Sequence, residues 1–134
     1  MKHRDGWTSF KEAARSKPTL QAGIQAVEAA LALLHEKFGP DLDSVLLFGS
    51  FARGSIYYDD IDLLIITSHP LGTSHEVIQR LSQEIFGPLF LNYGQLFSFQ
   101  VYGRDQFRRI KDHLLFLPGL IKEAIILYGE NPLI

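Results

Sequence analysis

Apolar positions repeat with helical spacing early in the chain. They follow one another at three- and four-residue steps, at Leu20, Ile24, Val27, Leu31, Leu34 and Phe38. This period predicts an amphipathic helix, which Gly39-Pro40 should stop. Before it, Ser9 and Glu12 have the spacing of a capping box and predict a short helix that ends before Pro18. Residues 1–18 are therefore expected to form an N-terminal extension with a short helix.

Three further segments have the pattern of strands. Residues 44–48 form a short apolar run, and residues 60–67 end in a fully apolar run that implies burial on both faces. Residues 96–102 alternate, with Phe97, Phe99 and Val101 on one face and polar side chains mixed into the other. We expect these segments to be the strands of one small sheet.

The remaining segments predict helices between and after these strands. Thr73 and Glu76 form a second capping-box pattern, and the helix that they open should end at Gly87-Pro88. Two more helices are predicted, at about 105–113 and about 120–128. Strands separated by helices predict an α+β (α/β-like) class with a small mixed sheet flanked by helices. The length of 134 residues predicts one domain over 1–134.

Composition narrows the class of protein. An apolar content of 46% with ten Phe indicates a folded globular chain, and a net charge of −2 gives no basic footprint for a nucleic-acid partner. The chain has no cysteine, which excludes disulfides and cysteine-ligated zinc. The first residues have no apolar signal region and no run approaches membrane-spanning length. We expect a cytoplasmic protein without a membrane association.

The most specific polar pattern joins a Gly-Ser pair to two acids. Gly49-Ser50 follows the first predicted strand, and after nine further residues Asp60 and Asp62 open the second. Alternation along a strand places both carboxylates on one face, where they repel each other unless a cation lies between them. Mg²⁺ binds through one or two carboxylates together with substrate phosphates. The turn offers backbone N–H groups to a phosphate, so the pattern predicts a site for a metal-bound nucleoside triphosphate.

This pattern resembles the signature of the DNA polymerase β-like nucleotidyltransferase superfamily, and the run 49–54, Gly-Ser-Phe-Ala-Arg-Gly, is typical of its minimal nucleotidyltransferases. The tail, 113–129, is similar to the closing helix of those domains. The resemblance covers roughly 20–129 and implies a nucleotidyltransferase fold that uses Mg²⁺ or Mn²⁺. It implies that Asp60 and Asp62 are catalytic and hold the metal, and that Gly49, Ser50 and Arg53 bind the nucleotide.

One feature of the resembling enzymes has no counterpart here. Active members carry a third acid on a neighbouring strand, and the matching strand presents only Ser98 and Gln100, of which Ser98 fits the register better. A neutral side chain cannot take a proton at neutral pH, so turnover is expected to be weak. Nearby, Arg53 could reach a triphosphate or brace the turn. Tyr57 and Tyr58 could stack on a base or pack on the protein.

Two functions follow from the resemblance. The first is Mg²⁺-dependent transfer of a nucleotidyl group from a nucleoside triphosphate such as ATP to a hydroxyl. The acceptor would be a small molecule, aminoglycosides being one example, or a protein side chain. The second is a catalytically weakened, nucleotide-binding antitoxin that pairs with a HEPN-domain ribonuclease toxin. Apolar helix faces at both ends of the chain also predict association, with such a partner or as a homo-oligomer.

Overall fold

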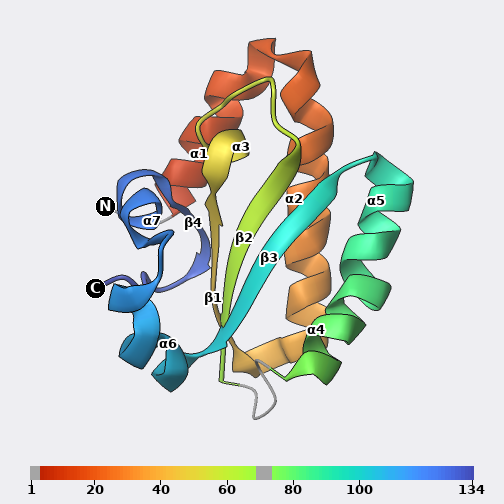
Figure 1. The fold of residues 1–134 in the computed structure, drawn as a ribbon. Helices are drawn as coiled ribbons and strands as arrows, with labels where there is room; N and C mark the ends of the chain where they lie inside the picture. Colours follow the sequence, from red (N-terminus) through yellow and green to blue (C-terminus); the bar gives the residue numbers. More distant parts are fainter. Residues whose placement is uncertain (1–3, 69–73) are drawn as a thin grey trace.

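The computed structural model describes residues 4–68 and 74–134 (Figure 1). The elements run in the order α1 (Arg4–Ala13), α2 (Pro18–Phe38), β1 (Leu42–Phe48), α3 (Gly49–Ala52), β2 (Asp60–Thr67), α4 (His75–Leu81), α5 (Gly87–Tyr93), β3 (Leu96–Gly103), α6 (Arg104–Ile110), α7 (Leu117–Glu123) and β4 (Ile125–Gly129). Short 3₁₀ turns follow α1, α2 and α6, and a π turn, Ser82–Phe86, joins α4 to α5. No helix in the described part of the chain is long and apolar enough to cross a membrane.

The sheet has the strand order β3-β2-β1-β4. Strand β1 is antiparallel to both of its neighbours, β2 and β4, whereas β2 and β3 are parallel. A parallel pair needs a crossover connection, which α4, the π turn and α5 provide. The predicted small mixed sheet flanked by helices is therefore confirmed.

Helices cover both faces of the sheet (Figure 1). On one face Ile61, Leu63 and Ile65 of β2 pack into a core cluster with residues of α2, α4 and α5. On the other face Leu64 and Ile66 pack with residues of α6 and α7. The apolar end of β2 is buried on both faces, as its sequence predicted.

The prediction for the tail was wrong in its second half. A single helix was expected over about 120–128, but α7 ends at Glu123 and the next residues form β4. Strand β4 pairs with β1, with Val45 opposite Tyr128 and Leu46 opposite Ile126. Two consecutive β-branched residues, Ile125 and Ile126, favour a strand once a neighbouring strand is available.

Two predicted helix boundaries also need correction. Ser9 lies inside α1, so it does not cap that helix, and Trp7 of α1 is buried in the main core. The helix expected to end at Gly87-Pro88 continues through them to Tyr93, because the π turn before them changes the hydrogen-bonding pattern where Pro88 cannot donate.

The cap of α4 differs from the sequence pattern, and the cap of α6 is a glycine. The predicted cap Thr73 lies outside the described residues. The hydroxyl of Ser74 accepts the hydrogen bond from the Val77 N–H at the start of α4. In α6 the cap is Gly103, and Asp105 lies in the first turn of the helix.

Candidate functional site

The Gly-Ser pair lies where β1 ends and the chain turns into α3. Gly49 has φ +81°, a conformation that side-chain-bearing residues rarely adopt. A Cβ atom at this position would also collide with the carboxylate of Asp62. Both observations require glycine here, and they show that the backbone of the turn lies directly against one of the two predicted acids.

Asp60 and Asp62 project from the start of β2 on the face that α6 and α7 cover further along the strand. The register aligns Asp62 with Ser98 of β3, and Ser98 hydrogen-bonds to the Asp62 carboxylate. Gln100 aligns with Leu64, one alternation further from the turn. The structure therefore brings together Gly49, Asp62 and Ser98, and it leaves Gln100 beside an apolar neighbour.

The environment of Asp62 disfavours its ionised form. Desolvation by burial, followed by repulsion from Asp60, raises the pKa of Asp62 from 3.8 to about 6. The Glu123 carboxylate raises this pKa further, whereas the Arg53 charge and the hydrogen bond from Ser98 lower it. The carboxylates around Asp62 thus leave a local excess of negative charge that a bound cation would relieve.

Arg53 does not extend freely into solvent. Its Nη1 atom donates to both carboxylate oxygens of Glu123, at 3.0 and 2.9 Å, and Oε1 of Glu123 also accepts from the backbone N–H of Gly49 at 3.2 Å. Of the two interpretations of Arg53, the observed contacts are those of a residue that braces the turn. The sequence pattern gave no sign of this role for Glu123, because it predicted a longer helix over about 120–128.

The two tyrosines of the loop before β2 differ in role. Tyr58 packs edge-on against Phe51, and its hydroxyl donates to Gln95 at 2.6 Å. Tyr57 is 88% exposed. Packing on the protein therefore accounts for Tyr58, and of the pair only Tyr57 is free to stack on a bound base.

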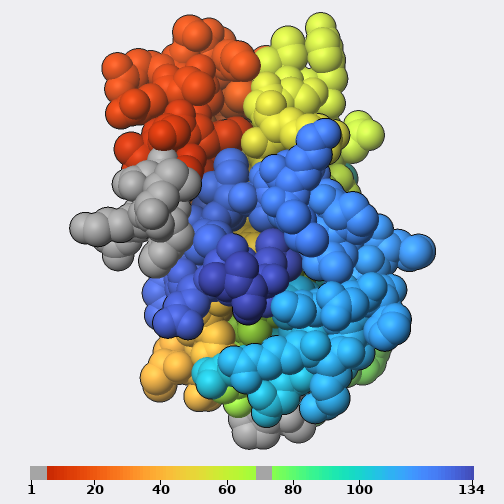
Figure 2. Space-filling view, turned by 90° about the vertical axis from the view of Figure 1, so that its left-hand side faces the viewer, coloured from red at the N-terminus to blue at the C-terminus, as the bar shows by residue number. Residues whose placement is uncertain are grey.

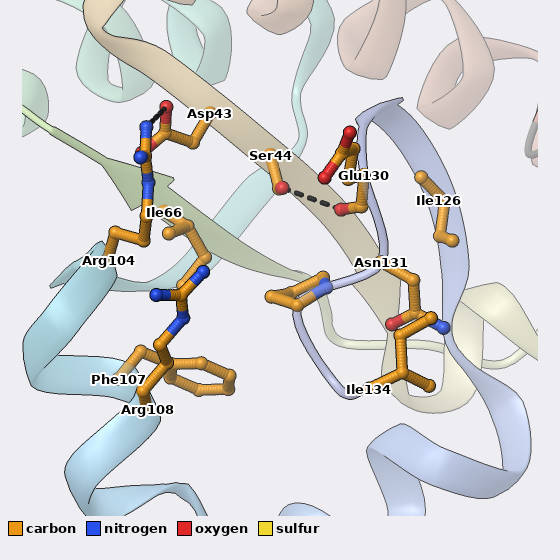
Figure 3. A pocket seen from close by; sticks show the side chains of 11 residues that line it. Asp43, Ser44, Ile66, Arg104, Phe107, Arg108, Ile126, Glu130, Asn131 and Ile134 are labelled. Atoms are coloured by element: carbon orange, nitrogen blue, oxygen red, sulfur yellow. Dashed lines mark hydrogen bonds and ion pairs between the residues drawn. The ribbon is translucent and has the colours of Figure 1, made fainter.

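A pocket of about 940 Å³ lies at the other end of the sheet (Figure 3). It is bordered by Asp43 and Ser44 at the start of β1, about 20 Å along the strand from Gly49. Arg104 is held there by Asp43 at 2.7 and 3.0 Å, and Arg108 points into the space between α6 and the tail. The pocket does not include the predicted chemical residues, so it is separate from the candidate site.

The described residues contain no group of three His, Cys, Asp or Glu side chains that could hold a metal ion. Asp60 and Asp62 form only a pair. Such a pair suits a cation whose remaining ligands come from water and substrate phosphates, and it does not suit a site made entirely of protein groups.

A comparison with curated proteins gives a relative that matches part of the chain. No family model matches the chain. A segment of 35 residues, 25% of this chain, is 54% identical to a candidate protein adenylyltransferase of Methanocaldococcus jannaschii. The match spans about a quarter, 24%, of that protein. The name of this relative agrees with the nucleotidyltransferase resemblance, which is confirmed over this segment.

The similarity to solved structures is low in both sequence identity and TM-score. A toxin–antitoxin with AMP-PNP is 16% identical with a TM-score of 0.49, over 76% of this chain and 73% of the other. A candidate nucleotidyltransferase from Sulfolobus solfataricus is 20% identical with a TM-score of 0.49, over 86% and 90%. Likenesses at this level assign neither an activity nor a partner to the chain.

Proposed function

We propose that the chain binds a metal-bound nucleoside triphosphate at Gly49, Asp60 and Asp62 and transfers its nucleotidyl group to a hydroxyl. The observation that carries this proposal is the contact between the Gly49 backbone and the Asp62 carboxylate. It lies beside a second acid on the same strand face. A phosphate on the turn and a cation on the acids would then be immediate neighbours. The relative named as a protein adenylyltransferase supports ATP as the donor.

The residues present fit a divalent cation. Two carboxylates on one face, one with a raised pKa, provide hard oxygen ligands in a place where their own repulsion is unfavourable. Asp60 and Asp62 would hold Mg²⁺ or Mn²⁺. When bound, the metal would neutralise negative charge on the phosphate oxygens during nucleotidyl transfer.

The chain's own residues would orient the reactants. The N–H groups at Gly49 and Ser50 and the guanidinium of Arg53 are donors for phosphate oxygens. In the transfer, the acceptor oxygen bonds to the α-phosphorus, the bond to the bridging oxygen breaks, and pyrophosphate leaves. Ser98 stands beside Asp62 but cannot accept the hydroxyl proton at neutral pH. The proton must then pass to solvent or to a substrate group, and turnover should be slow.

The same comparison supports one class of acceptor. The name of the relative favours a protein hydroxyl, although small molecules such as aminoglycosides remain in the set to be tested. Tyr57, at 88% exposure, belongs to the loop that leads into Asp60, and an acceptor protein could reach this loop.

A second function is favoured by the neutral Ser98. If turnover is too slow to matter, the chain would act as a nucleotide-binding antitoxin that binds a HEPN-domain ribonuclease. Exposed apolar side chains of α5 and β3, namely Phe90, Leu91 and Leu96, offer a contact surface for a partner or a second copy. An adjacent gene for a small helical HEPN-like protein would favour this function.

The experiment is incubation with α-labelled ATP and Mg²⁺ in the presence of candidate acceptors, including a co-expressed HEPN-like protein. We expect slow transfer of label that Asp60→Asn and Asp62→Asn both abolish. Label transfer that persists in both variants would show that these acids are not the site. Metal-dependent ATP binding without transfer to any acceptor would favour the antitoxin function.

A further inference from the structure

The carboxylate of Glu123 accepts the hydrogen bonds that the Gly49 turn can donate. Its Oε1 accepts from the Gly49 N–H at 3.2 Å and from Nη1 of Arg53 at 3.0 Å, while Oε2 accepts from the same Nη1 at 2.9 Å. The Glu123 side chain is only 18% exposed, whereas that of Arg53 is 56% exposed. A largely enclosed acid therefore reaches the turn from the end of α7.

The position of this acid is unfavourable apart from these contacts. Glu123 is the last residue of α7, where the carbonyl end of a helix disfavours a negative charge. Its charge also adds to that of Asp60 in raising the pKa of Asp62. The donors at Gly49 and Arg53 are the groups that offset these costs.

Those donors have the chemistry of an anion site. A backbone N–H next to a guanidinium binds a phosphate oxygen as readily as a carboxylate oxygen, with charge-assisted hydrogen bonds in both cases. The yellow segment after β1 and the blue segment near the C-terminus lie side by side on the surface (Figure 2), consistent with the contact between α3 and α7. An incoming phosphate would therefore meet the Glu123 carboxylate on the donors that it needs.

We propose that Glu123 is an internal occupant of the phosphate position and sets the affinity of this site for nucleoside triphosphates. This inference rests on the proposed function, because it names the side chain that a bound triphosphate must displace. Binding breaks the pair between Arg53 and Glu123 and transfers the Gly49 N–H and the guanidinium to phosphate oxygens. A ligand with a phosphate at the turn bears the full cost of this displacement. A nucleoside without phosphates bears none of it.

The test is titration of Glu123→Gln with Mg²⁺-ATP, pyrophosphate and adenosine, compared with wild type. Gln keeps the shape but loses the charge, so ATP and pyrophosphate should bind about 3- to 10-fold more tightly, by the same factor, with adenosine unchanged. Glu76→Gln is the matched control, because it breaks an Arg–Glu pair of 2.7 Å on α4, at the far end of the sheet. If Mg²⁺-ATP and pyrophosphate both bind Glu123→Gln no more tightly than wild type, the proposal is overturned.

The outcomes separate this inference from the proposed function. If wild type binds Mg²⁺-ATP through Asp60 and Asp62 but Glu123→Gln gives no gain, only the inference fails. If wild type binds no ATP, the proposed function fails, and the pyrophosphate titration still tests the competition. Glu123→Ala repeats the test should Glu123→Gln fold poorly. The Gly49 amide resonance of the wild-type chain needs no variant: pyrophosphate should shift it saturably, and an unmoved resonance would contradict the displacement.

Discussion

Replacing Asp62 with Asn should stabilise the nucleotide-free protein at neutral pH while removing its response to metal and nucleotide. The Asp62 carboxylate is partly buried, faces Asp60, and contacts the Gly49 turn. Asn has nearly the same shape, and its carbonyl oxygen can still accept the hydrogen bond from Ser98. The substitution therefore removes a charge that the fold disfavours and leaves the packing in place.

The magnitude follows from the raised pKa. A rise from 3.8 to about 6 corresponds to about 3 kcal/mol of unfavourable free energy for the ionised form. Part of Asp62 remains in contact with solvent, and Asn also loses the attraction of Arg53, so we expect a net gain of about 1–2 kcal/mol at pH 7. Folding raises the pKa of Asp62, so protonated Asp62 favours the folded wild-type protein. This contribution to the unfolding free energy is fully present below about pH 4, and it is lost as the pH rises through about 6.

Chemical denaturation across pH 3.5 to 8 measures this effect. The difference in unfolding free energy between Asp62→Asn and wild type should be near zero at the acid end and should grow between pH 4 and 6. Asp59→Asn is the matched control, since Asp59 is exposed directly before the same strand and its substitution should change stability little. A destabilised Asp62→Asn at pH 7 would refute the claim that the fold holds this charge at a cost.

Three more predictions concern the same site. Gly49→Ala should lower the unfolding free energy by roughly 2 kcal/mol or more, from the strained φ and the collision with Asp62, and calorimetry should show no ATP binding. Ser98→Asp should increase nucleotide turnover, by less than the roughly 10²–10⁴-fold typical of a positioned base, and equal turnover in the two proteins would contradict the role of a missing acid. Mg²⁺-ATP affinity should fall roughly tenfold from pH 7.5 to 5, because protonation of Asp62 near pH 6 competes with the cation. A pH-independent affinity would exclude Asp62 as a ligand.

The sequence predicted β2 and its acid pair because both depend on local alternation. Asp60 and Asp62 share a face for the same reason that Ile61 and Leu63 share the other, and no distant residue is needed to see it. The alternation of β3 was predictable in the same way, and it places Ser98 and Gln100 on one face of that strand. Only the pairing of strands decides that Ser98 is the neighbour of Asp62.

The end of the chain could not be predicted because its structure is decided by a distant strand. Residues 120–128 have apolar spacing compatible with a helix, and β4 forms only because the edge of β1 is available to Ile126 and Tyr128. The role of Glu123 was hidden by the same error, because its partners Gly49 and Arg53 lie far away in sequence. Local patterns thus predicted the two acids of the candidate site, but they did not predict the Glu123 carboxylate that contacts its turn.

The central claim is that the Gly49 turn and the acid pair form one metal-dependent nucleotide site. Calorimetric titration of ATP into the wild-type chain, with Mg²⁺ and with a chelator, tests it most directly when repeated with Asp60→Asn and Asp62→Asn. We expect saturable binding with Mg²⁺, at least tenfold weaker binding with the chelator, and a similar loss in both variants. Equal affinities in all of these titrations would show that the acids hold no nucleotide-bound metal, and would contradict the account.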